Sequence, residues 1–302
     1  MFAATSFANP WRFQSNIEVY VLVGFLIGAY TYMVRVIGPK AVSPGEVVVT
    51  RRQLRCFVGS MVMLFAASTW PIHQIGEDYL YSAHMLQHMM LSYFLPPLVL
   101  LATPEWLLRV LVGEGLTYRI VRFFAKPVVA AVLFNGMVMI THIPLVVNTT
   151  TVNGPLHFSL HLMVVLTAVL AWMPVVGPLP ELQMRHGGKM IYLFLFSVVP
   201  TVPAAWLAVA ERPVYSHYGD QPVRVWNIDA INDQQVAGLI MKVGGGMFLW
   251  TIVIYMFFKR FGRETPQENS YRRADAPEAA LTYDEVTTAF DASRAPIEAE
   301  PR

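Results

Sequence analysis

Two pairs of histidines, each spaced four residues apart, are the residues of this sequence most able to do chemistry. His84 and His88 lie in the run SAHMLQHMM, and His157 and His161 lie in GPLHFSLHLM. On an α-helix, residues i and i+4 share a face, so each pair can direct two imidazoles at one centre. Imidazole nitrogens bind zinc, copper, iron and nickel. The spacing therefore predicts a metal site built from two helices.

The sulfur-containing residues narrow the choice of metal. Cys56 is the single cysteine, which excludes a disulfide framework and weakens a structural zinc site, since such sites typically use thiolates. Met85, Met89 and Met163 lie near the histidine pairs, and thioethers suit Cu(I). Most of the 16 methionines are nevertheless expected to pack in the core. The sulfur-containing residues therefore disfavour a structural zinc site and leave copper among the metals that imidazole can bind.

The elements that must position these histidines are membrane-spanning helices. Hydrophobic residues make up 55% of the chain and charged residues 14%, against about a quarter charged in soluble domains. A helix needs about 20 mostly apolar residues to cross a bilayer. The stretches that meet or approach this length are 17–36, 55–71, 80–101, 128–147, 155–176, 190–210 and 234–258, with Pro71 expected to end the second. We predict an all-α, polytopic membrane helical bundle with seven transmembrane helices.

The basic residues predict the orientation of the bundle. Fourteen lysines and arginines follow spans one, three, five and seven, whereas Arg12, Arg212 and Arg224 alone lie on the other side. Because basic residues accumulate in cytoplasmic loops, the N-terminus is expected outside and the C-terminus in the cytoplasm. The run Met1–Pro10 lacks the basic start of a signal peptide, so the first span is expected to be retained.

In this orientation the histidine pairs lie below the outer surface. His88 is roughly 12 Å into span three and His161 roughly 9 Å into span five, at 1.5 Å per residue. Polar side chains at such depth usually face the bundle interior and mark a functional site. Asp233, which opens span seven at the same surface, is expected either to cap its own helix or to orient a ligating histidine. The predicted metal site comprises His84, His88, His142, His157, His161 and Asp233.

Two features have no assigned role. Lys242 lies roughly 13 Å into span seven, where a lysine usually has a partner or a water-filled cavity. Residues 264–302 are rich in Pro, Ala, Glu and Asp, and they carry too few large apolar side chains to offset their ordering entropy. We predict a seven-helix domain over residues 1–263 and a disordered, acidic cytoplasmic tail over 264–302.

Several runs resemble the polytopic CtaG family, bacterial membrane proteins implicated in assembly of haem-copper cytochrome c oxidase. These runs are SAHMLQHMMLSYFLPPLVLLATP, THIPL, HFSLHLM, WMPVVGPLP and NDQQVAGLIM, and the resemblance covers roughly residues 15–260. The family's polar positions fall on His84, His88, His142, His157, His161, Asp233 and Gln234. The resemblance implies a multi-pass protein of the bacterial plasma membrane that helps to mature the oxidase. It further implies delivery of copper, from an unknown donor, to the catalytic copper-containing subunit.

Of the other functions considered, a haem protein is the alternative that stays open. A membrane b-type haem protein or quinol oxidoreductase needs one axial histidine on each side of a haem, and the two pairs can supply both. A retinal protein on Lys242 is disfavoured, because no carboxylate is expected near mid-depth to act as counter-ion. A copper permease would need polar groups that continue to the cytoplasmic side. The inner halves of the spans have few such groups, so a permease is disfavoured. Since the sequence has no nucleophile elbow, P-loop, paired-carboxylate site or basic stripe, we expect neither an enzyme nor a nucleic-acid-binding protein.

Overall fold

The fold is helical throughout the residues that the structure, a computed structural model, describes: 9–274 and 283–292. These ranges contain no strand, so the predicted all-α class is confirmed. The chain forms two units, residues 1–254 and residues 255–302, which are described separately. The histidine pairs belong to the first unit.

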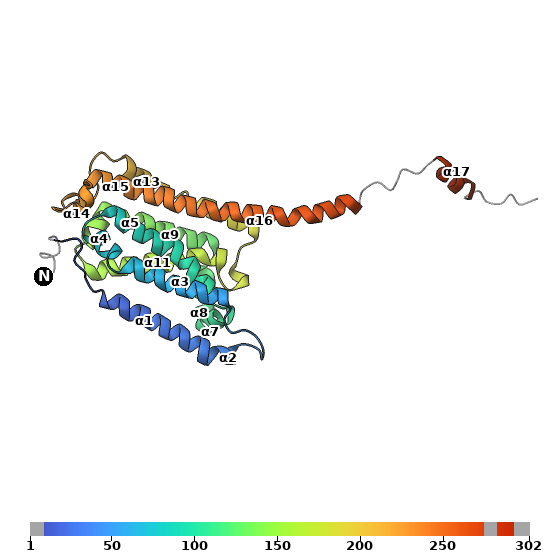
Figure 1. The fold of residues 1–302 in the computed structure, drawn as a ribbon, viewed down its shortest axis with the longest axis horizontal. Helices are drawn as coiled ribbons and strands as arrows, with labels where there is room; N and C mark the ends of the chain where they lie inside the picture. The colour runs from blue at the N-terminus through green and yellow to red at the C-terminus, as the bar shows by residue number, and fades with distance from the viewer. Residues whose placement is uncertain (1–8, 275–282, 293–302) are drawn as a thin grey trace, which may run out of the picture. The chain divides into compact units, whose positions relative to one another are not determined.

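The first unit consists of helices joined by short connections (Figure 1). They are α1 (Ile17–Tyr32), α2 (Gly38–Ala41), α3 (Arg51–Ser68), α4 (Ile72–Asp78), α5 (Tyr81–Met89), α6 (Leu95–Ala102), α7 (Glu105–Val112), α8 (Leu116–Phe124), α9 (Pro127–Thr141), α10 (Pro144–Thr150), α11 (Gly154–Val176), α12 (His186–Phe196), α13 (Thr201–Val209), α14 (Ser216–Gly219), α15 (Ala230–Leu239) and the start of α16 (Gly245–Ala274). Single π-helical turns, Met33–Ile37, Met90–Phe94 and Ile240–Gly244, connect α1 to α2, α5 to α6 and α15 to α16.

Most of the predicted spans correspond to helices of sufficient length and hydropathy. Within the described ranges, six runs can cross a membrane: Ile17–Ala41, Arg51–Asp78, Tyr81–Ala102, Gly154–Val176, His186–Val209 and Ala230–Arg260. A seventh is present if α8 and α9, which are inclined at 70° to each other, form one broken span. The predicted fourth span, 128–147, is interrupted between α9 and α10. The chain therefore has six to seven candidate spans, and the orientation of its termini stays a prediction.

Local sequence explains where the important helices begin and bend. Thr50 and Gln53 form a reciprocal capping box at the start of α3. Asn153 accepts from the backbone N–H of Leu156 and so caps α11. Pro96 and Pro97 occupy the first turn of α6, directly after a π-helical turn, as expected for residues that lack a backbone donor.

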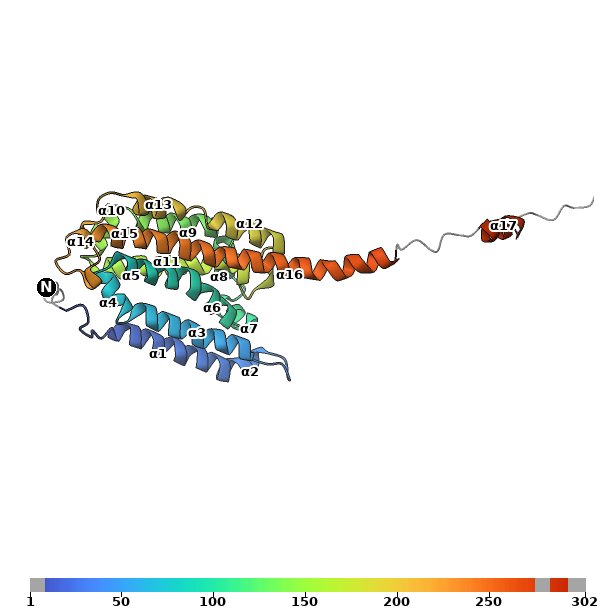
Figure 2. The same ribbon diagram turned by 45° about the horizontal axis from the view of Figure 1, so that its top comes forward.

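The helix that carries His84 and His88 is the most buried candidate span. In the 18-residue apolar stretch within Tyr81–Ala102, 56% is buried inside the protein, whereas in that within Ile17–Ala41 at the edge 6% is buried. α5 packs against α4 and α15, and α6 packs against α3 and α11. Figures 1 and 2 show α5, α11 and α15 running alongside one another, with α1 at the margin. The first histidine pair is thereby placed in the centre of the bundle.

Glycines allow two of the close helix contacts. A Cβ atom added to Gly76 of α4 would lie 2.9 Å from the backbone nitrogen of His84 in α5. A Cβ added to Gly238 of α15 would lie 2.6 Å from the carbonyl oxygen of Ala204 in α13. Because the contacted atoms belong to the backbone, any larger residue would force the helices apart. Gly76 therefore fixes α4 against the histidine-bearing helix.

The second unit contains the end of α16 and the helix α17 (Tyr283–Ala292). The predicted disorder of residues 264–302 stays a prediction, because 275–282 and 293–302 lie outside the described residues. The described part of this segment is helical.

Candidate metal centre

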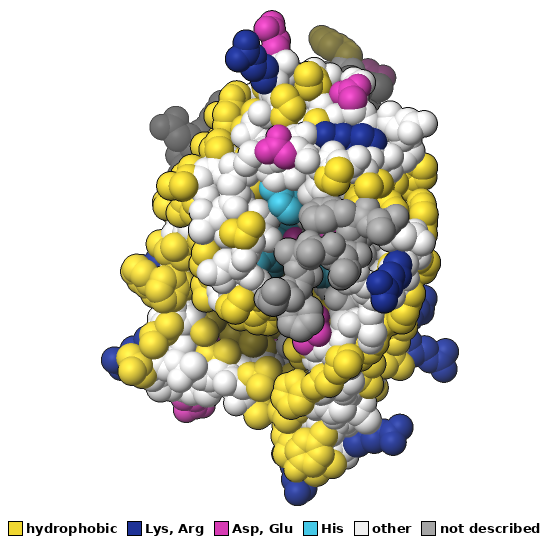
Figure 3. Space-filling view, turned by 90° about the vertical axis from the view of Figure 1, so that its left-hand side faces the viewer, with side chains coloured by type: hydrophobic (Ala, Val, Ile, Leu, Met, Phe, Trp, Pro, Cys, Tyr) yellow, Lys and Arg dark blue, Asp and Glu magenta, His cyan; other side chains and the backbone are white. Residues whose placement is uncertain are grey.

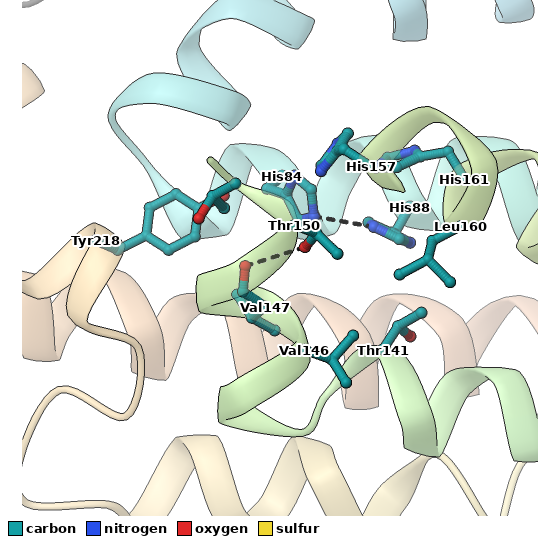
Figure 4. Close-up of a pocket in the computed structure, with 11 residues that line it drawn as sticks. His84, His88, Thr141, Val146, Val147, Thr150, His157, Leu160, His161 and Tyr218 are labelled. Atoms are coloured by element: carbon teal, nitrogen blue, oxygen red, sulfur yellow. Dashed lines mark hydrogen bonds between the residues drawn. The ribbon is translucent and has the colours of Figure 1, made fainter. Parts of the chain in front are cut away.

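The structure brings the four paired histidines together between α5 and α11. His84 Nε2 and His88 Nε2 are 2.9 Å apart. Across the helices, the ring centroids are 5.9 Å apart for His84 and His157, and 4.7 Å apart for His88 and His161. The ring centroids of His84 and His161 are 5.5 Å apart, so His161 lies close to both residues of the first pair. Figure 4 shows the four rings gathered at one cavity.

A carboxylate that the sequence analysis overlooked lies among these rings. His157 Nε2 is 3.0 Å from both carboxylate oxygens of Glu77, Oε1 and Oε2. Oε1 is also 3.2 Å from His84 Nδ1 and 3.9 Å from His161 Nε2. Glu77 is therefore the one described acidic side chain that contacts both histidine pairs.

Glu77 escaped prediction because the second span was expected to end at Pro71. The chain instead resumes as α4 after that break and turns Glu77 toward α5 and α11. One sequence signal was available: His73 and Glu77 are four residues apart and so share a helix face. Their side chains are 3.8 Å apart in the structure.

Two overlapping sets of residues have the spacing of metal ligands. One consists of His84, His88 and His161, and the other of Glu77, His157 and His161; in each, single donor atoms lie within 4.8 Å of one another. Metal–nitrogen bonds of about 2.0–2.1 Å in a tetrahedral site place donors roughly 3.3 Å apart. The observed separations bracket this value, so small side-chain movements suffice to bind an ion.

Several ring nitrogens at the centre lack a hydrogen-bond partner. Among the described residues, the buried atoms His84 Nδ1, His161 Nε2 and His142 Nε2 make no hydrogen bond. His84 Nδ1 lies close to Glu77 but without hydrogen-bond alignment. Buried polar groups in folded proteins are normally satisfied, and unsatisfied ones often mark an unplaced ion or water. The unpaired nitrogens are therefore available as ligands.

The histidines line a small cavity of about 30 Å³. Its wall also includes Thr150 from α10 and Tyr218 (Figure 4). A volume of this size holds roughly one or two water-sized groups. It accommodates a metal ion but leaves no room for a porphyrin ring.

His142 lies beside the four histidines at the end of α9. Its Nδ1 is 2.6 Å from the carbonyl oxygen of Val138, and its Nε2 has no partner among the described residues. It lines a second, smaller cavity that His88 also lines. His142 belongs to neither of the two donor sets, so the structure places it next to the centre and not within it.

Asp233 plays a structural part that differs from both sequence expectations. The cap of α15 is Asp229, whose carboxylate accepts from the backbone of Ile231 and Asn232. Asp233 instead accepts from the backbone N–H groups of Tyr81 and Ser82, at 2.7 and 3.0 Å, and from the Ser82 hydroxyl.

The prediction that Asp233 caps its own helix was therefore wrong, and its carboxylate contacts no histidine ring in the described structure. It satisfies the free N–H groups at the start of the neighbouring α5 and places a negative charge at the positive end of that helix. Asp233 thereby holds the helix on which His84 and His88 lie.

The connection between α13 and α15 ties the surrounding helices to the centre. The Tyr218 hydroxyl donates to the carbonyl of Gly76 at 2.9 Å, and the Tyr215 hydroxyl donates to that of His142 at 3.0 Å. His217 Nε2 lies 2.9 Å from the carbonyl oxygen of Glu77. Burial raises the pKa of Tyr215 to about 12 and that of Tyr218 well above its ordinary value, so both stay neutral donors near neutral pH.

The centre lies toward one end of the first unit. Figure 3 looks onto the end at which α4 and α14 lie, and histidine side chains are visible there close to acidic ones. The part of this face covered by grey residues is not described. Near this end the side chains of His73 and Glu77 are 27% and 17% exposed.

Lys242 is not part of the centre. Its side chain is exposed on the π-helical turn between α15 and α16, and Nζ donates to the hydroxyl of Thr201 at 2.7 Å. Thr201 opens α13 directly after Pro200, at the break between α12 and α13. The hydroxyl is therefore the partner that the sequence did not identify.

Comparison with known proteins gives one match. The family model described as cytochrome c oxidase caa3 assembly factor (Caa3_CtaG) matches residues 28–262. No curated protein and no solved structure matches the chain. The matched range contains α3 to α15, and with them every residue of the candidate centre.

Proposed function

Because the chain belongs to the cytochrome c oxidase caa3 assembly factor family, we propose that it holds copper at its histidine cluster and delivers it to the oxidase. The recipient in this proposal is the catalytic copper-containing subunit. The protein contributes the donor set and the position of the ion, and copper is its cargo. No chemical conversion is part of the proposed role.

The observation that carries the proposal is the convergence of four imidazoles on one cavity, with one carboxylate, Glu77, beside three of the rings. Nitrogen ligands without thiolates suit copper, and the neutral rings bind a cation without adding charge of their own. Glu77 supplies one negative charge at 3.0–3.9 Å from three of these rings. A buried cation needs such compensation, because an unpaired charge in a dry interior is costly.

The location that fits this role is the bacterial plasma membrane with the cluster toward the outer face. The excess of lysine and arginine in alternate connections supports this orientation. The cluster then opens on the side from which an ion could be passed to a partner in the same membrane. The family supports the oxidase as that partner.

The alternative of a haem protein is disfavoured by the packing of the rings. A haem with two axial histidines needs a flat space between the ligands for the macrocycle. Here His88 Nε2 is 2.9 Å from His84 Nε2, and the ring centroids of the two pairs are 4.7–5.9 Å apart. Copper fits this spacing better than haem.

The direct test is the copper content of the purified protein. The wild-type chain, loaded with Cu(I) under anaerobic conditions and desalted, is expected to keep copper. A variant with His84, His88, His157 and His161 all replaced by Ala is expected to lose it. His186→Ala is the matched control, since His186 begins α12 and belongs to neither donor set. Equal copper in the wild type and the fourfold variant would refute the proposal.

A further inference from the structure

The two donor sets are stacked along the helices. His88 lies one turn after His84, and His161 lies one turn after His157, which is roughly 6 Å deeper along each helix. The set of His84, His88 and His161 therefore extends deeper than the set of Glu77, His157 and His161. The two sets share His161, so a ligand need not be lost completely when an ion moves between them.

The shallower set of Glu77, His157 and His161 (the upper set) has the features of a separate binding position. Its donors include a carboxylate oxygen as well as ring nitrogens, and His161 Nε2 is buried without a hydrogen-bond partner among the described residues. This unpaired nitrogen lies 3.9 Å from Glu77 Oε1, while His157 Nε2 lies 3.0 Å from Oε2. An ion between these three residues would satisfy the nitrogen and replace the contact between Glu77 and His157.

The upper set also lies nearer to the route out of the bundle. The side chain of His84 is 10% exposed, that of Glu77 17%, and that of His73 27%. The side chain of His73, which lies in the first turn of α4 after Pro71, is 3.8 Å from that of Glu77. Side-chain exposure thus increases from His84 through Glu77 to His73.

We infer that the cluster provides two successive positions for a cargo ion: a deep one at His84, His88 and His161, and an exit one at Glu77, His157 and His161. This inference rests on the proposed function, since it describes how a held copper ion leaves. Transfer is an exchange of ligands with no change in oxidation state. Bonds to His84 and His88 break as bonds to Glu77 and His157 form, and His161 stays bound.

The direction in which Glu77→Gln changes the rate of copper release distinguishes an exit ligand from an orienting residue. If Glu77 is an exit ligand, Glu77→Gln removes the intermediate position, and the ion leaves the deep position more slowly. If Glu77 only orients His84, the same change should weaken binding roughly 10–100-fold, the usual effect of losing such an orienting group. Weaker binding speeds release. The two roles therefore predict opposite changes in rate.

The experiment measures release of Cu(I) from the full-length protein in detergent to a colorimetric chelator under anaerobic conditions. Glu77→Gln and His157→Ala are both expected to keep copper and to release it roughly ten-fold more slowly, which corresponds to about 1.4 kcal/mol. His88→Ala, which disrupts the deep position, is expected to release copper faster. The matched control is Asp78→Asn, because the neighbouring Asp78 bonds to Gln74 and not to a histidine ring. It should release copper at the wild-type rate.

The outcomes separate failure of this inference from failure of the proposed function. A wild-type protein that keeps no copper contradicts the proposed function itself. A wild type that keeps copper, together with Glu77→Gln and His157→Ala variants that release it as fast as the wild type or faster, overturns the two-position inference alone. Thermal unfolding of each variant shows that its fold is intact before rates are compared.

Discussion

Replacing Gly76 with Ala tests whether the centre depends on close contact between α4 and α5. The added Cβ would lie 2.9 Å from His84 N, 3.0 Å from His84 Cα and 3.2 Å from the carbonyl carbon of Ala83, whereas ordinary contacts are 3.4–4 Å. Since all three are main-chain atoms, the helices must separate by about 0.5–1 Å. Overpacking of this kind costs about 1–3 kcal/mol. Alanine's better helix propensity returns at most about 1 kcal/mol.

The separation should also weaken copper binding. Glu77 follows Gly76 directly, and its carboxylate is 3.2 Å from His84 Nδ1. Separating the helices also shifts α5, and with it His84 and His88, relative to His161 on α11, which disrupts the deep position. We expect Gly76→Ala to lower the thermal unfolding temperature, followed by tryptophan fluorescence in detergent, and to hold copper less tightly against a chelator.

Gly136→Ala is the control for this change. Gly136 also lies within a helix, α9, but a Cβ there meets no atom within 4 Å. Its substitution should leave copper binding unchanged and stability equal or slightly higher. Wild-type unfolding temperature and copper affinity in the Gly76→Ala variant would show that the contact between α4 and α5 does not hold the centre together.

Three further results are expected. Asp233→Ala should destabilise the protein by about 1–3 kcal/mol in denaturant unfolding, because it leaves the N–H groups of Tyr81 and Ser82 unsatisfied. Asp233→Asn, which keeps one acceptor, should destabilise it less. Wild-type stability of both variants would contradict the role of Asp233 as a cap of α5. Lys242→Met should improve membrane insertion, since a lysine near a helix centre costs about 2.5–3.5 kcal/mol on insertion scales. It should leave copper binding unchanged, because the Nζ atom contacts Thr201 and no histidine of the centre. Loss of copper would place Lys242 in the site. The purified protein should show no Soret band, and its appearance would revive the haem alternative.

Helical periodicity was sufficient to predict much of this centre. The i, i+4 spacing put His84 with His88 and His157 with His161, and the expected depths of His88 and His161 placed the pairs at a similar level. Both conclusions follow from regular helices, in which position along the chain determines face and depth. In the structure, the four rings lie at one cavity.

The contacts of Glu77 and Asp233 could not be predicted from the sequence, because they depend on breaks between helices and on how helices pack. Glu77 reaches the rings because the chain resumes as α4 after the break at Pro71, and a rule that ends a span at proline assigns that segment to a loop. Asp233 was expected to act on its own helix, but its partners are in α5, 151 and 152 residues away in the sequence. Contacts of this kind depend on how helices pack, which local periodicity does not encode.

The central claim is that the histidine cluster supplies copper to the oxidase, and its most direct test is the metal content of the oxidase itself. In cells whose only copy of this protein carries His84→Ala and His88→Ala, the purified oxidase should contain haem but lack copper at its catalytic centre, and its activity should fall. Cells with His186→Ala and equal amounts of the protein in the membrane should make normal oxidase. Full copper content and activity in the double variant would contradict the claim.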